Sequence, residues 1–188
     1  SSGACAGEVN YDWQVKKPSF SDFLPVSLLN PSWVVGDDLL IPASDVDEVG
    51  CWEIKLIAVN PAACLAESVY ADTINIEDIP DADFNDIGDI CQNEQITLTD
   101  ASNIIFAECD PTLPNETPTY AWTVSPNSGY VLGNDIDGNP TSLNSQNPVI
   151  TFTEVGTYTV DLTVTTECGS DTHSETFDVL GNPTVAFP

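Results

Sequence analysis

The stretch VGTYTVDLTV, residues 155–164, gives the clearest structural signal in the chain. Its apolar residues alternate with threonine and aspartate, at Tyr158, Val160, Leu162 and Val164. This period of two residues is typical of a β-strand that has one face in a core and the other in water. The glycine before the alternation, Gly156, allows a tight entry from a loop. We therefore predict a central strand of a β-sandwich here.

The same pattern occurs a second time about 105 residues upstream, as VGCWEIKLIAV at residues 49–59. A shorter phrase also recurs, as YDWQV at residues 11–15 and YAWTV at residues 120–124. Both repeats have a spacing close to the usual size of a β-sandwich unit. The chain is therefore predicted to be all-β, with two serial β-sandwich domains.

Domain boundaries follow from the same comparison. Sequence for further strands precedes YAWTV, but none precedes YDWQV. We therefore expect the first domain to lack its N-terminal strands. The prediction is a partial domain over residues 1–78, an acidic linker over 79–90, a complete domain over 91–183 and the start of a next linker at 184–188. The partial domain carries an insert over residues 16–48, whose four prolines exclude a long helix.

Charge excludes several classes of partner. The net charge is −27, with three lysines and no arginine. Nucleic-acid binding depends on lysine and arginine, so no nucleic-acid partner is expected. An anionic membrane surface is disfavoured for the same reason. No apolar run reaches the length of a membrane-spanning helix, so no membrane span is predicted.

Cysteine usage indicates the compartment. The chain has six cysteines and no CxxC pair. In small β units this usage is typical of disulfides formed in an oxidising place. We therefore predict an extracellular protein.

Catalytic signals are weak. The one histidine, His173, stands between Thr172 and Ser174, and nothing near it in the sequence indicates the nucleophile and acid of a hydrolase triad. One histidine and disulfide-bonded cysteines also leave too few ligands for zinc. The prediction is that the chain is not an enzyme.

Calcium is the one cofactor that the acidic residues indicate, because it takes six to eight oxygen ligands. The joint between the domains and the loop at residues 134–139 offer such ligands at Glu77, Asp78, Asp81, Asp83, Asp135 and Asp137. Binding there would neutralise local charge and fix the angle between the domains. The alternative is that the acids are solvated, that the loop is a polar turn and that packing alone sets the angle.

Aromatic residues divide into two groups. Those on the apolar faces of predicted strands are assigned to the core: Trp13, Trp52, Trp122 and Tyr158. Trp33 lies in the irregular insert, and with Tyr130 and the acids of the loop at 125–146 it provides the alternative of a carbohydrate-binding module. A third interpretation is an accessory domain of a secreted hydrolase whose catalytic part lies elsewhere.

Several phrases resemble the polycystic-kidney-disease type of immunoglobulin-like domain: YAWTV at 120–124, NPVITF at 147–152, VGTYTV at 155–160 and ECG at 167–169. They are also similar to the cysteine-containing version found in tandem in large surface proteins of Bacteroidetes, including gliding-motility adhesins exported by the type 9 secretion system. The match covers most of residues 91–183 and, more loosely, residues 5–76. The WDFGDG phrase of the standard domain is absent, because TVSP stands there at 123–126.

The resemblance implies two serial immunoglobulin-like domains in the stalk or filament of an adhesin. Neighbouring repeats of the same long chain would be its partners, together with surface glycans or other cell-surface proteins. Thr73, within Asp72-Thr73-Ile74, looks like the short O-glycosylation signal of exported Bacteroidetes proteins.

The resemblance also implies a pairing of the cysteines. In the immunoglobulin-like pattern the tryptophan strand and the strand entered by Val-Gly are antiparallel neighbours, which brings the start of one beside the end of the other. The implied bonds are Cys5–Cys64 and Cys109–Cys168. A Cys91–Cys168 bond is the alternative, and a Cys51–Cys91 bridge across the joint is also left open.

Overall fold

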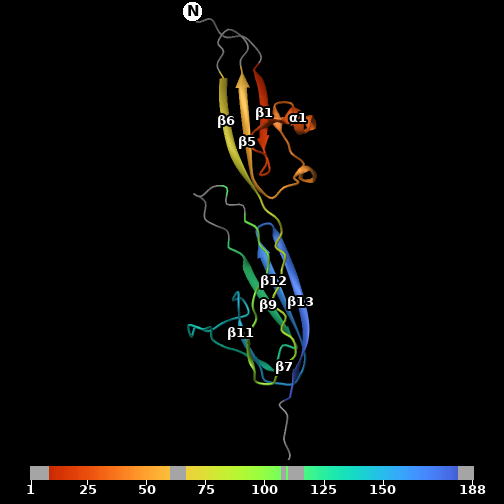
Figure 1. Cartoon of the computed structure of the whole chain (residues 1–188), viewed down its shortest axis with the longest axis vertical. Coiled ribbons are helices and arrows are strands. Elements are labelled where there is room, and N and C mark those ends of the chain that lie inside the picture. The colour runs from red at the N-terminus through yellow and green to blue at the C-terminus, as the bar shows by residue number, and fades with distance from the viewer. Residues whose placement is uncertain (1–8, 60–66, 107–108, 110–116, 182–188) are drawn as a thin grey trace, which may run out of the picture. The chain divides into compact units, whose positions relative to one another are not determined.

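The structure, a computed structural model, describes residues 9–59, 67–106, 109 and 117–181 (Figure 1). Strands dominate these residues, and the one α-helix among them, α1 (Val26–Leu29), has four residues. The predicted all-β fold class is therefore confirmed. The chain divides into two compact units. Unit 1 holds the described residues up to Glu77 together with Phe106 and Cys109, and unit 2 holds residues 78–105 and 117–181.

Unit 1 is built on one antiparallel sheet in the order β2-β1-β5-β6. Its strands are β1 (Asn10–Lys16), β2 (Leu24–Pro25), β5 (Gly50–Val59) and β6 (Glu67–Ile76). The VGCWEIKLIAV phrase forms β5, which lies between β1 and β6 in Figure 1 and pairs with both. β6 is the outermost strand of the sheet, and nine of its ten residues are exposed.

The proline-rich insert covers one face of this sheet. Its elements are α1, 3₁₀ turns at Pro31–Trp33 and Ala43–Asp45, and a ribbon of β3 (Val34–Val35) and β4 (Asp38–Leu39). Val26 and Trp33 from the insert pack with Val15 of β1 and Trp52 of β5. Proline keeps each element short because it lacks a backbone N–H and has a fixed φ. Unit 1 is thus a partial sandwich, in which short elements take the place of a second sheet.

Unit 2 is a sandwich of two sheets. The first, in the order β7-β13-β12-β9, consists of β7 (Ile90–Cys91), β9 (Thr119–Ser125), β12 (Gly156–Thr166) and β13 (Gly169–Leu180). The second, in the order β10-β11-β8, consists of β8 (Gln95–Thr97), β10 (Tyr130–Leu132) and β11 (Val149–Phe152). Both sheets contribute to one core, with Trp122 and Leu162 from the first and Ile150 and Phe152 from the second.

The VGTYTVDLTV phrase forms β12, which pairs with β9 on one side and β13 on the other. It is therefore a central strand, as predicted. Its alternating apolar residues are almost fully buried: Tyr158, Val160, Leu162 and Val164. Val155 lies before the strand and is 56% exposed. The buried face of β12 supplies much of the core of unit 2.

Strand pairing shows the internal repeat directly. β1-β5-β6 in unit 1 and β9-β12-β13 in unit 2 have the same antiparallel order. Trp13 lies opposite Leu56 in unit 1, and Trp122 lies opposite Leu162 in unit 2. These two pairs occupy equivalent places in the repeated phrases, so the units share one three-stranded pattern with one register.

The predicted acidic linker at residues 79–90 is wrong. This segment belongs to unit 2, where Ala82 and Phe84 are buried in the core. Asp81 and Asn103 exchange backbone hydrogen bonds of 3.0 and 2.9 Å. Exposed Asp81 and Asp83 alternate with the two buried residues, so the segment does have the period of a strand facing a core. Its many acids concealed that short alternation.

Candidate functional site

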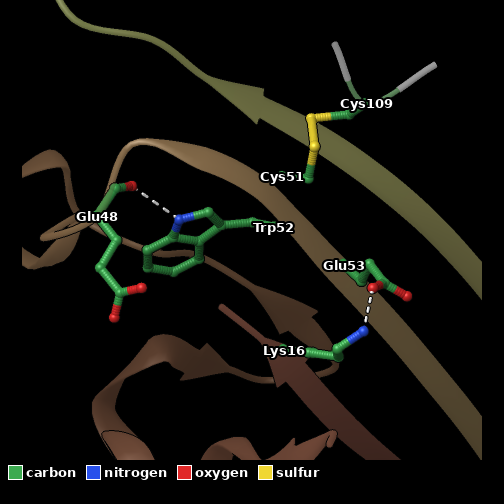
Figure 2. Close-up of a disulfide and its surroundings, with 6 residues drawn as sticks. All are labelled: Lys16, Glu48, Cys51, Trp52, Glu53 and Cys109. Atoms are coloured by element: carbon green, nitrogen blue, oxygen red, sulfur yellow. Dashed lines mark hydrogen bonds and ion pairs between the residues drawn. A yellow bond between two sulfur atoms is a disulfide. The ribbon is translucent and has the colours of Figure 1, made fainter. Parts of the chain in front are cut away.

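A disulfide between Cys51 and Cys109 is the most distinctive chemical feature of the described residues (Figure 2). The two residues are 58 positions apart in the sequence, and their Cα atoms are 5.3 Å apart. Cys51 belongs to β5 and directly precedes Trp52, whose indole N–H donates to the carbonyl of Glu48 at 3.0 Å. Successive strand residues point to opposite faces, so Cys51 projects away from the face that holds Trp52 in the core. The bond therefore attaches Cys109 to the outer face of the unit 1 sheet.

This bond corrects the expected cysteine pairing. Cys109 is bonded to Cys51, so neither the Cys109–Cys168 bond nor the Cys51–Cys91 bridge is formed. The physical reason lies in the path of the chain: Phe106 and Cys109 belong to unit 1, although the residues before them fold into unit 2. Sequence spacing carried no sign of this excursion.

Strand register also contradicts the alternative Cys91–Cys168 bond. Cys91 lies opposite Leu180, the last residue of β13, whereas Cys168 directly precedes the first residue of that strand. A strand of 12 residues separates the two positions by roughly 35 Å. Cys91 is an exposed free thiol. The Cys5–Cys64 bond stays a prediction, because both residues lie outside the described ones.

The candidate calcium ligands do not come together. The hypothesis named six carboxylates: Glu77, Asp78, Asp81, Asp83, Asp135 and Asp137. Across the described ranges, no three His, Cys, Asp or Glu side chains form a group that could hold a metal ion. Two of the carboxylates accept from neighbouring backbone N–H groups instead, Asp78 from Ile79 and Asp83 from Phe84, each at 2.8 Å. The joint and the 134–139 loop therefore do not form one composite cation site.

Asp135 organises the turn at residues 134–139. Its Oδ1 accepts from the backbone N–H groups of Asp137 and Asn139 at 3.0 and 2.8 Å. Its Oδ2 accepts from the side-chain amide of Asn139 at 3.1 Å. These bonds, above all those from Asn139, hold the pKa of the Asp135 carboxyl below its ordinary value of 3.8. The structure thus gives the loop the form of a hydrogen-bonded polar turn.

Two acids on β13 have a structural role that the sequence did not reveal. Asp171 accepts a hydrogen bond from the backbone N–H of Ala82 at 2.9 Å. Both carboxylate oxygens of Glu175 accept from the backbone N–H of Ile87 at 3.1 Å. A carboxylate that accepts from backbone N–H makes a charge-assisted bond. These two acids thus accept hydrogen bonds from backbone N–H groups and hold residues 79–90 against β13.

Replacing Glu175 with alanine is expected to lower the stability of unit 2 by about 1–2 kcal/mol, because the backbone N–H of Ile87 loses its acceptor. Glu175→Gln keeps one carbonyl oxygen as an acceptor and should have a smaller effect. Chemical denaturation of the three chains measures the difference. Equal stability of the alanine and natural chains would show that water replaces the carboxylate without loss.

All three lysines lie in unit 1, and each is engaged by a neighbour. The contacts are Lys16 with Glu53 at 2.6 Å (Figure 2), Lys17 with Asp47 at 2.5 Å, and Lys55 over the Phe23 ring at 4.1 Å from its centroid. Unit 2 contains no lysine or arginine. Its surface charge is therefore anionic throughout, which opposes the approach of any polyanion.

The aromatic residues of the carbohydrate-binding alternative are not displayed as a stacking platform. Trp33 is 3% exposed, and its indole N–H donates to Asp45 Oδ2 at 2.7 Å. Tyr130 is half-buried, with its ring centroid 6.2 Å from that of Phe152. Trp33 thus offers no free face to a sugar, and one side of Tyr130 is occupied by the core.

Asp45 should help to hold the insert at neutral pH. Hydrogen bonds from Trp33 and Ser44 keep the pKa of its carboxyl below the ordinary value of 3.8. A carboxyl whose pKa is lower in the folded than in the unfolded state stabilises the fold. This stabilisation is present above the pKa of the unfolded state and is lost as the pH falls through the pKa of the folded state. We therefore expect Asp45→Ala to lower the melting temperature of unit 1 by several degrees at pH 7. Asp45→Asn, which keeps an acceptor for Trp33, should lower it less.

The difference in melting temperature between the Asp45→Ala and natural chains should shrink as the pH falls below 3.8, because the natural carboxyl loses its charge as the pH passes through its lowered pKa. Thermal melts between pH 2.5 and 7 measure it. A constant difference over that range would show that the charge on Asp45 makes no contribution.

Two other residues named from the sequence lie on strands. His173 of β13 has Nε2 3.6 Å from Asp83 Oδ1 and meets the ring of Phe84 edge-on, with centroids 5.0 Å apart. Thr73 is exposed on β6, opposite Glu53 of β5. His173 thus contacts an acid and an aromatic ring, and Thr73 is accessible from solvent.

The four aromatic residues assigned to the core differ in burial. Trp52, Trp122 and Tyr158 are each 2% exposed, whereas Trp13 is half-buried. Trp122 packs against Phe84, with ring centroids 5.2 Å apart. Phe84 comes from residues 79–90 of unit 2, whereas Trp13 is a partly buried neighbour of the smaller unit 1 core and donates its indole N–H to the carbonyl of Asp37 at 3.0 Å. The difference in burial therefore reflects the partial sandwich of unit 1.

No helix of the described residues has the length and apolar character needed to cross a membrane. No protein-family model matches the sequence, and no curated protein matches it either.

Several solved structures are similar in fold. A fragment of Dscam1 isoform 1.9 with its N-terminal four Ig domains has 10% identity and a TM-score of 0.38, and the match covers 93% of this chain and 38% of that one. Domains 4 and 5 of the S-layer protein SbsC have 12% identity and a TM-score of 0.38, and the match covers 90% of this chain and 70% of that one. The fibronectin(III)-like modules of CbhA from Clostridium thermocellum have 10% identity and a TM-score of 0.34, and the match covers 94% of this chain and 87% of that one. These likenesses are distant, so the description of the fold rests on the chain's own strand pairing.

Proposed function

We propose that this chain is a non-catalytic structural segment of a long cell-surface adhesin, in which serial β-domains form a stalk or filament that holds an adhesive end away from the cell. The shared register of the two units carries this proposal. Trp13 opposite Leu56 and Trp122 opposite Leu162 mark two copies of one pattern in series. A strand pattern repeated in series suits a role as a spacer.

Chemistry supports an extracellular place for this spacer. The Cys51–Cys109 disulfide needs an oxidising compartment to persist. The net charge of −27 keeps long chains soluble and apart from one another. Neighbouring repeats of the same chain are the proposed partners, with surface glycans or other cell-surface proteins bound by the adhesive end.

The finer assignment follows the sequence resemblance. We propose that the parent protein is a large surface adhesin of the Bacteroidetes type, built from polycystic-kidney-disease-type repeats and exported by the type 9 secretion system. The tandem β units are in keeping with that class. The carbohydrate-binding alternative is less well supported, because Trp33 is buried.

Deletion of residues 9–181 from the gene of the parent protein tests the proposal. Electron microscopy of cells with antibody-labelled adhesive ends should show the label closer to the envelope, because a spacer has been removed. Purified parent protein with the deletion should bind its surface target as the natural protein does. Unchanged label distance, or loss of target binding by the purified protein, would overturn the spacer role. Loss of glycan binding in particular would favour a carbohydrate-binding module.

A further inference from the structure

The chain passes between the two units more than once. Residues 78–105 fold into unit 2, Phe106 and Cys109 belong to unit 1, and the described chain from residue 117 onward belongs to unit 2 again. Cys109 is bonded there to Cys51. From Cys51, one covalent route into unit 2 follows the backbone past Glu77, and a second crosses the two sulfur atoms to Cys109 and follows the backbone onward from there.

These two routes are not equivalent when the chain is pulled from its ends. In a chain without a Cys5–Cys64 bond, tension follows the shortest covalent path, which runs to Cys51, through the disulfide and onward from Cys109. The residues between these cysteines form a closed loop beside that path. The loop contains most of β5, all of β6, the connection after Glu77, and strands β7 and β8.

We propose that the Cys51–Cys109 disulfide limits the extension of this chain and carries tension past the connection after Glu77. The protected loop includes the paired strands β5 and β6, whose register runs over ten residue pairs. Pulling on the chain ends cannot stretch this loop while the sulfurs remain bonded. Without a Cys5–Cys64 bond, load on unit 1 instead acts on β1, which pairs with β5 over seven residues.

The expected limit has a definite length. The sequence separation of the two cysteines is 58 residues. A fully extended chain spans at most about 3.3–3.6 Å per residue, so the bond withholds about 200 Å of extension. This inference goes beyond the proposed spacer role, because it holds for the isolated chain whatever its place in a cell.

Single-molecule pulling of the full chain by its ends tests the proposal. Two chains are compared. In the first, serine replaces Cys5, Cys64, Cys91 and Cys168, so that only Cys51 and Cys109 remain. The second carries Cys51→Ser and Cys109→Ser in addition. We expect complete unfolding to extend the second chain about 200 Å further than the first. Dithiothreitol, which ends as a cyclic disulfide while the two cysteines end as thiols, should give the first chain the same longer extension. Equal extension of the two chains without reductant would overturn the proposal.

A second measurement uses the natural cysteines and does not depend on the folding of the serine chains. A protease site placed between Glu77 and Asp78 allows the chain to be cut at the connection. The halves should stay joined on a non-reducing gel and separate after reduction, because Cys51 and Cys109 lie on different halves. Separation without a reductant would overturn the second covalent route. Both tests use the isolated chain, so their failure would leave the spacer proposal to its own experiment.

Discussion

Replacing Phe152 with alanine should lower the free energy of unfolding of unit 2 by about 3–5 kcal/mol. Phe152 is 0% exposed, at the point where the two sheets of the sandwich meet. Its ring touches three others, with centroid distances of 4.7 Å to Tyr158, 5.3 Å to Phe177 and 6.2 Å to Tyr130. Alanine would leave a cavity among rings that hold one another in place, so the surroundings should collapse only partly.

Hydrogen exchange of the β11 and β12 amides measures this loss in unit 2 alone, because it reports the opening free energy of each strand. Ile136→Ala is the matched control, since Ile136 is 101% exposed and its removal leaves no cavity. The control should stay within about 0.5 kcal/mol of the natural chain. A loss below about 1 kcal/mol for Phe152→Ala would be incompatible with a ring at the centre of the core.

Replacing both Cys51 and Cys109 with serine should lower the free energy of unfolding of the whole chain by about 4 kcal/mol. The bond connects residues 58 positions apart, and without it the unfolded chain regains the entropy of that loop. The loop includes β6 of unit 1 and β8 of unit 2. The full effect should therefore appear only when both units are unfolded.

Guanidinium denaturation followed by tryptophan fluorescence and circular dichroism measures this effect. Cys91→Ser is the control, because Cys91 is an exposed thiol outside the bond. It should change stability by no more than about 0.5 kcal/mol. The same midpoint for the double-serine and natural chains would mean that the disulfide adds nothing to equilibrium stability.

Local periodicity was sufficient to predict the main strands. The alternation in VGTYTVDLTV sets which side chains of β12 face the core, and Tyr158 and Leu162 are buried as that alternation requires. The second copy of the phrase located β5 for the same reason. Such patterns are local, because a strand must match its own two faces whatever the rest of the chain does.

Features set by distant contacts could not be predicted in this way. The prominent acids of residues 79–90 predict a linker, yet Phe84 packs on Trp122 and Glu175 accepts a hydrogen bond from Ile87. The predicted Cys109–Cys168 bond is wrong because the pairing of Cys109 depends on where its segment goes after it leaves unit 2.

The exposed outer strand of unit 1 has a consequence for handling the protein. β6 leaves Val69, Tyr70 and Ile74 exposed by 54%, 64% and 44% at the rim of its sheet. Among the described residues no strand pairs with the outer edge of β6. A sheet edge with apolar side chains is a template for aggregation, and natural proteins often protect such edges with lysine. This chain has only three lysines, so its protection against aggregation is the mutual repulsion of anionic molecules. That protection disappears as the carboxylates are protonated towards the isoelectric point near pH 4.1. Colloidal stability should therefore be high at neutral pH and collapse in mild acid, before the fold itself is lost.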